Sequence, residues 1–441
     1  MKQSKHNIYY SPKEVRTILE RSIDTALDGL KGYCNDPVSD FTRCRKLPAR
    51  TLIECIMSFS NYSSIGELSH FFAGQGEMPS ASALSQRRQL LDPDIFKRIN
   101  NLFVSAFDDH TTINGYHILA QDGSDVNIPF MDDKTKTEKH DAKSFCQYHV
   151  NALYDCLNKV FYDWSIDAAS KKREVNALIS ILKDRNYPQN SIFTADRGYE
   201  SYNLMAHFIE NDIKFVIRVK DIHTKSGLMT NIKTEEGAFD MRINRTLTSL
   251  QTKEIKADKE KYIFVPSTSN FDFLDENRDF YDLSFRAVRF KISEDTYETV
   301  VTNLSEEEFK TEDFKELYHY RWNEETAFNK LKYTIGLVYF HARKRKLIQQ
   351  EINAAFLMYN VSEVIIRNID LKKNKKPELE YDYKPNFSSA VTNIRLYLRK
   401  KISMKELILR IKKFLVAQRP ERSFERNIKG QSCKPLNYRT S

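Results

Sequence analysis

Four polar side chains with useful chemistry share one face of a predicted helix, Glu316 to Lys332. The stretch contains no Gly or Pro and is rich in good helix formers, so a helix is favoured. At about 100° per residue, Arg321, Glu325 and Lys332 all fall within about 60° of Tyr318. Arg and Lys can bind a phosphate, Tyr offers a hydroxyl and Glu offers a metal-binding carboxylate. Taken alone, the stripe fits either a functional site or a solvated face with an Arg-to-Glu ion pair.

The spacing within this helix, Tyr318-x2-Arg321-x3-Glu325-x6-Lys332, resembles the Tyr-Arg-Glu-Lys signature of bacterial insertion-sequence transposases of the insertion-sequence-4 family. The strings at 79–88 and 418–426 are similar to terminal regions of the same family. The resemblance implies that Glu325 is the third carboxylate of an Asp-Asp-Glu metal site on a ribonuclease-H-like fold. Two aspartates must therefore end strands upstream.

Two aspartates meet that requirement. A short apolar run, Tyr116 to Gln121, leads into Asp122, and we expect the following Gly to end the strand. Ser191 to Ala195 is a second short strand that leads into Asp196. Each aspartate alone could simply make a turn, and Asp125 is a nearby alternative for the first position. Their order and their strand-end placement favour a joint site.

The elements around these aspartates follow the order strand, strand, strand, helix, strand, helix, strand. We expect the first three strands to be antiparallel and the fourth to lie parallel to the first, as in a ribonuclease-H-like α/β core. This arrangement would place Asp122 beside Asp196. The other expected elements are a hairpin, two helices and a last strand: Tyr148–Tyr154 with Val160–Ile166, Arg173–Asp184, Ser201–Ile209 and Ile213–Val219.

Further segments flank or interrupt this core. Residues 1–110 read as a helical N-terminal DNA-binding domain with a loose helix-turn-helix, on which Arg87 and Arg88 would contact DNA; packing of an all-helical domain is the alternative. Residues 221–304 read as a β-rich insertion domain, with strands expected over 254–265, 281–292 and 296–302. The catalytic core would then comprise 111–220 and 305–370. A strand at Leu337–Ala342 and a long helix at Leu347–Asn368 are expected in its second part.

The net charge of +9 is concentrated at the C-terminal end of the chain. Residues 371–441 contain 19 Lys and Arg against 6 Asp and Glu, which is a local balance of +13. This basic helical region favours a polyanionic partner, although a solubilising tail is the alternative. The chain has no apolar run long enough to cross a bilayer and no signal-peptide pattern. We therefore expect a soluble bacterial cytoplasmic protein associated with the nucleoid.

The three carboxylates suit phosphodiester chemistry. Cleavage and transesterification need an activated hydroxyl and a stabilised leaving oxygen, which two divalent ions can supply. Mg²⁺ prefers oxygen ligands, so Asp122, Asp196 and Glu325 would hold two Mg²⁺ ions, and Mn²⁺ could substitute. Glu324 falls about 100° from Glu325 on the helix, so we expect it on the surface. No nucleotide-binding motif is present.

The resemblance also implies that DNA is held around the scissile phosphate by Tyr318, Arg321 and Lys332. Arg197, beside the second aspartate, would either join them or form an ion pair with the site. His149, on the second strand, is expected to be a core or edge histidine and not a ligand.

These expectations together indicate a cut-and-paste DNA transposase that acts on terminal inverted repeats and target DNA. Because two element ends must be cut in concert, we expect a homodimer in a synaptic complex. Two alternatives stay open. One is a transposase-derived DNA-binding protein that no longer cuts, and the other is a structure-specific nuclease on the same fold.

Overall fold

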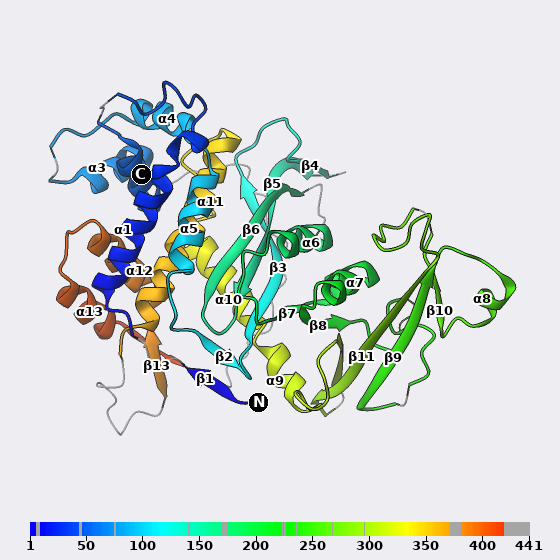
Figure 1. Ribbon diagram of the computed structural model, residues 1–441. Coiled ribbons are helices and arrows are strands. Elements are labelled where there is room, and N and C mark those ends of the chain that lie inside the picture. The colour runs from blue at the N-terminus through cyan, green and yellow to red at the C-terminus, as the bar shows by residue number, and fades with distance from the viewer. Residues whose placement is uncertain are drawn as a thin grey trace.

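A computed structural model describes residues 1–5, 9–43, 46–74, 76–139, 142–169, 174–222, 224, 226–234, 236–266, 268–294, 296–370 and 381–418. The protein is built around one large mixed β-sheet, with helices of the N-terminal and C-terminal segments gathered at one end of it (Figure 1). Among the described residues, no helix combines the length and the apolarity needed to span a membrane.

The strands that carry the expected site form one half of this sheet in the spatial order β6-β5-β3-β7-β8. β3 pairs antiparallel with β5, β5 pairs antiparallel with β6, and β3, β7 and β8 are parallel neighbours. This is the pairing that the sequence predicts for a ribonuclease-H-like core. Their bounds are His117–Ile128 for β3, Ala142–Asp155 for β5, Val160–Ala168 for β6, Ser191–Ala195 for β7 and Lys214–Val219 for β8, while the short β4 is Lys136–Lys139.

The strands of residues 221–304 extend the same sheet, because β12 pairs antiparallel with β8 and β11 lies between β12 and β9. Figure 1 shows β9, β10 and β11 at the far end of the sheet from the N-terminal helices. The strand predicted over 254–265 is largely wrong, since a short helix occupies its first part. The bounds are Phe239–Thr248 for β9, Lys253–Ala257 for α8, Tyr262–Phe264 for β10, Phe280–Ser293 for β11 and Thr296–Thr302 for β12.

The long helix α11 (Arg345–Arg367) forms the centre of the apolar core, with most of its residues buried. Trp164 of β6 stacks on Phe356 of α11, with ring centroids 4.4 Å apart, and donates a 2.8 Å hydrogen bond to Asn353. The helix also packs on α5 (Asp94–Val104). Burial of aromatic and aliphatic side chains on both sides of α11 joins the N-terminal helices to the sheet.

Some of the remaining N-terminal helices begin at a residue whose side chain caps them. Ser11 and Glu14 form a capping box at the start of α1, and the Ser80 side chain caps α4. The bounds are Pro12–Asp28 for α1, Ala49–Met57 for α2, Ser64–Phe72 for α3 and Ala81–Leu90 for α4, with a 3₁₀ turn at Leu30–Tyr33 and a small sheet of β1 (Gln3–Lys5) and β2 (Thr111–Ile113).

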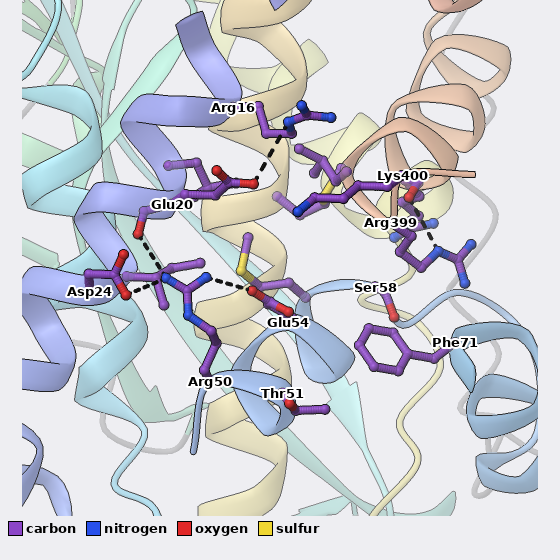
Figure 2. A pocket seen from close by; sticks show the side chains of 16 residues that line it. Arg16, Glu20, Asp24, Arg50, Thr51, Glu54, Ser58, Phe71, Arg399 and Lys400 are labelled. Carbon is purple, nitrogen blue, oxygen red and sulfur yellow. Dashed lines mark hydrogen bonds and ion pairs between the residues drawn. The ribbon is translucent and has the colours of Figure 1, made fainter. Parts of the chain in front are cut away.

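The C-terminal helices α12 (Phe387–Leu398) and α13 (Met404–Lys413) pack beside α1 and α11, and β13 (Asp382–Pro385) pairs with β14 (Leu415–Gln418). A cavity of about 460 Å³ lies between α1, α2 and α12 (Figure 2). Arg50 pairs there with Asp24 and Glu54, so the acidic wall is largely neutralised. Two parts of the expected basic region 371–441, residues 371–380 and the basic tail 419–441, lie outside the described residues.

The predicted helix Glu316–Lys332 is divided in the structure. α9 (Asp313–His319) ends just before Arg321, α10 (Trp322–Asn329) follows, and the chain then widens into a π-helical turn, Lys330–Ile335. Such turns change the angular step of the helix. The strand expected at 337–342 is absent, because this described segment forms turns and bends that lead into α11. The helices α6 (Glu174–Asp184) and α7 (Tyr202–Glu210) lie close to their predicted positions.

Candidate active site

The two aspartates occupy equivalent positions on neighbouring parallel strands. The β3–β7 ladder ends at the pair Gln121 and Ala195, and the next residue on each strand is Asp122 or Asp196. Gly123 does not end the strand, contrary to the sequence prediction, because β3 continues to Ile128 in its pairing with β5. β3 continues past Asp122, but β7 does not. The edge of β3 that faced β7 is therefore unpaired from Asp122 onward.

Asp122 is a partly buried carboxylate in an acidic environment. Its Oδ1 accepts a 2.8 Å hydrogen bond from the N–H of Gly123. The pKa of Asp122 is raised to about 6, chiefly by burial and also by the negative charges of Asp196 and Glu325, while the Gly123 N–H and Arg321 oppose the shift. Negative charges close enough to raise the pKa of Asp122 favour a cation among these carboxylates.

Asp196 lies at the start of a 3₁₀ turn, Arg197–Tyr199, and its Oδ1 accepts a 2.7 Å hydrogen bond from the N–H of Gly198. Asp196 therefore makes the turn that the sequence allows, and its charge also lies close enough to Asp122 to raise the pKa of that carboxyl. Arg197 is exposed, and no ion pair of its side chain occurs among the described residues. Its guanidinium is open to a phosphate near the site.

Arg321 connects the strand carboxylates to the helix. Its Nη1 lies 3.7 Å from Asp122 Oδ2 and its Nη2 lies 3.6 Å from Glu325 Oε1. The side chain is only 3% exposed, and Nε donates a 3.1 Å hydrogen bond to the hydroxyl of Tyr318. Tyr318 is itself buried, so in this structure it orients Arg321 and does not present a free hydroxyl to DNA.

Lys332 lies in the π-helical turn and still reaches the site. Burial lowers the pKa of its ammonium group, and the charges of Asp125 and Asp122 oppose that change. The turn displaces Lys332 from the regular helical stripe predicted from the sequence, yet the residue remains within electrostatic range of the first aspartate.

Two features of the site are not expected from the sequence. Glu324 is fully buried, which contradicts the predicted surface position; burial holds its pKa well above the usual value, and the Asp122 charge adds to this effect. His149 lies between Asp125 and Glu174 next to the site. One feature of the sequence could have indicated the partner of His149. The sequence predicts both β3 and β5, and in their antiparallel pairing Asp125 and His149 are opposite each other.

The N-terminal arginines expected to bind DNA face the protein interior. Arg88 is 2% exposed, and its Nη2 lies 2.8 Å from Glu351 on α11 and donates to the carbonyl of Leu347. Arg87 is also buried and donates to the carbonyl of Leu47. The expectation of DNA contact is corrected here: both arginines join α4 to the rest of the protein.

The donor set suits a hard divalent ion, although the side chains do not enclose one as they are placed. No group of three or more His, Cys, Asp or Glu side chains in the described part of the chain is arranged to hold a metal ion. Mg²⁺ commonly takes only a few carboxylates and completes its shell with water and substrate phosphate. Asp122 and Asp196, at the edges of neighbouring strands, and Glu325, on a helix, therefore fit such an ion.

Comparison with known proteins identifies the family. Residues 113–361 match the family model of the transposase DDE domain, which is more than half of the chain. The protein belongs to this transposase family. No curated protein matches the chain. Among solved structures, a piggyBac transposase synaptic complex with hairpin DNA matches with a TM-score of 0.45 and 11% identity, over 96% of this chain and 90% of that chain.

The raised pKa of Asp122 predicts how the stability of the protein changes with pH. The folded protein holds the Asp122 proton more tightly than the unfolded chain, so this group's contribution to stability falls as the pH rises from about 4 to about 6. Without metal, Asp122→Asn should raise the free energy of unfolding by about 1–2 kcal/mol at pH 7.5 and by little at pH 4. Thermal unfolding across this range measures the difference; an equal gain at both values would contradict it.

Proposed function

We propose that this transposase-family protein catalyses metal-dependent cleavage at transposon ends and transfer of the freed strand into target DNA. The carrying observation is that the buried guanidinium of Arg321 lies beside both Asp122 and Glu325, while the charges of Asp196 and Glu325 both act on Asp122. The Tyr-Arg-Glu-Lys spacing also supports membership of the insertion-sequence-4 family.

In this proposal Asp122, Asp196 and Glu325 would hold two Mg²⁺ ions, with Mn²⁺ as a substitute. When bound, such ions activate the attacking hydroxyl and stabilise the leaving oxygen. Arg321 would donate N–H groups to the scissile phosphate, with its orientation fixed by Tyr318. Lys332 and the exposed Arg197 would add positive charge on either side of the phosphate.

We assign the steps of this proposed reaction to separate segments of the chain. Cleavage is assigned to 111–220 and 305–370, the strands of 221–304 form the insertion, and DNA recognition involves the N-terminal segment 1–110 and the basic segment 371–441. Coordinated cutting of two ends requires a homodimer, so we propose a synaptic complex of two copies with paired DNA ends and target DNA.

A strand-transfer assay separates this function from its alternatives. The DNA flanking the gene should supply short inverted repeats, and a duplex ending in that repeat should become covalently joined to a target plasmid. Cleavage without joining would indicate a structure-specific nuclease. Binding without cleavage would indicate a transposase-derived DNA-binding protein, and either result would overturn the proposal.

The basic tail provides a separate prediction for DNA binding. Residues 419–441 contain six Lys and Arg. Replacing all six with Gln keeps the chain length and should make DNA binding less steeply salt-dependent, by roughly 0.9 in the log–log slope for each phosphate that these side chains neutralise. Binding isotherms between low and moderate salt measure the slope. An unchanged slope would show that the tail is a solubilising extension.

A further inference from the structure

His149 lies between two carboxylates, each close to one of its ring nitrogens. Its Nδ1 lies 2.7 Å from Asp125 Oδ1 and its Nε2 lies 3.0 Å from Glu174 Oε1. A neutral imidazole carries a hydrogen on only one nitrogen, so the other lone pair would face a carboxylate oxygen. A ring protonated at both nitrogens donates a hydrogen bond from Nδ1 to Asp125 and carries a positive charge within ion-pair distance of Glu174. The placement of the ring between two carboxylates therefore favours an imidazolium.

This imidazolium lies against the backbone that carries the first aspartate. His149 is opposite Asp125 in the β3–β5 ladder, and its side chain is 2% exposed. A Cβ on Gly123 would come within 2.3 Å of His149 Nε2, so only Gly leaves room for the ring. The residue before this glycine is Asp122. A movement of the ring would therefore shift the backbone next to Asp122.

The second carboxylate is reached through Glu174. A Cβ on Gly198 would lie 3.4 Å from Glu174 Oε2 and 2.9 Å from Asp196 Oδ1. Glu174 is in the first turn of α6, and Gly198 donates the hydrogen bond that fixes Asp196. Asp125, His149 and Glu174 are therefore linked by short contacts, and α6, which carries Glu174, packs against the turn that follows Asp196.

We propose that His149 is a positioning residue, a cation held between Asp125 and Glu174 that fixes the relative placement of Asp122 and Asp196 for metal binding. The proposal rests on the metal-dependent function proposed above. The imidazolium places a positive charge between Asp125 and Glu174, which lie beside two further carboxylates. In agreement, the two carboxylates outweigh burial and raise the pKa of His149 to about 9.

The charge on the ring can be measured directly in the wild-type protein. Protein labelled with ¹⁵N-histidine should show both ring nitrogens of His149 protonated at pH 7.5, with the signal assigned by its loss in His149→Gln. A neutral tautomer at this pH, with one protonated and one bare nitrogen, would overturn the proposal.

The positioning role is tested by Mn²⁺ binding, measured by calorimetry in the absence of DNA. His149→Gln should weaken Mn²⁺ affinity about 10- to 100-fold, the usual effect of removing a residue that orients metal ligands. His207→Gln is the matched control, because His207 makes a similar 2.7 Å contact with Asp272 but lies on α7 outside the site, and it should leave the affinity unchanged.

The outcomes distinguish the two proposals. If wild-type protein and His149→Gln bind Mn²⁺ equally, or if His207→Gln weakens the affinity as much, the positioning role is wrong while the metal-dependent function stands. If the wild-type protein binds no Mn²⁺ with or without end-bearing DNA, the proposed function fails, and the positioning role fails with it.

Discussion

Glu325→Gln is expected to reduce cleavage of an end-bearing duplex by several orders of magnitude while DNA binding is retained. The substitution keeps the size of the side chain but removes the charge that would hold a metal ion beside Asp122. It also leaves Arg321, 3.6 Å away, without one of its two carboxylate neighbours, so phosphate binding should not weaken. Cleavage rates and DNA affinity, measured on the same preparation, separate these two effects.

The adjacent Glu324 is the matched control for Glu325. Glu324 is fully buried, and burial raises its pKa well above the usual value. Gln keeps the size of the Glu324 side chain and leaves Asp122, Asp196 and Glu325 unchanged, so Glu324→Gln should cleave within a few-fold of the wild-type rate. If Glu324→Gln abolishes cleavage and Glu325→Gln does not, the assignment of the third carboxylate is wrong.

Arg88→Ala is expected to lower the free energy of unfolding by about 3–5 kcal/mol, the usual cost of removing one partner of a buried ion pair. Its guanidinium pairs with Glu351 at 2.8 Å and lies over the ring of Phe59. Glu351 also accepts a 3.0 Å hydrogen bond from His341, so removal of the Arg88 side chain disturbs the packing between α4, α11 and the segment before α11. Chemical denaturation measures the change.

An exposed arginine of the same segment provides the control for Arg88. Arg98 is on the outer face of α5, so Arg98→Ala should change stability by less than about 0.5 kcal/mol. A stable Arg88→Ala variant with weakened DNA binding would contradict the buried placement of this side chain and would favour a direct role in DNA contact.

Local sequence signals predict many elements closely. β7 and β12 have the predicted bounds, and the capping box at Ser11 marks the start of α1. Short apolar runs between polar turns are strong local signals, and capping residues act within one helical turn. The order of these elements is also sufficient to predict which strands lie beside β3.

The sequence predictions differ from the structure where tertiary contacts determine how a strand continues or which partner a side chain has. A Gly after a short apolar run predicts the end of a strand at Gly123. In the structure β3 continues because it pairs with β5, and the absence of a side chain on Gly123 leaves room for His149. Glu324 is predicted on the surface because a helical projection gives an angle and not the neighbours packed at that angle. Arg88 is predicted to contact DNA because arginine commonly binds phosphate. Its actual partner, Glu351, lies on α11, which is far from Arg88 in the sequence. The extension of the sheet through β12 also depends on long-range pairing.

Metal-dependent cleavage by the wild-type protein tests the central claim most directly. A duplex that ends in the inverted repeat from the flanking DNA should be cut at the repeat boundary with Mg²⁺ or Mn²⁺, leaving a 3′-hydroxyl. Ca²⁺ should permit binding with little cutting. Cleavage that persists in excess EDTA, at the same position and rate, would contradict the assignment of Asp122, Asp196 and Glu325 as a metal site.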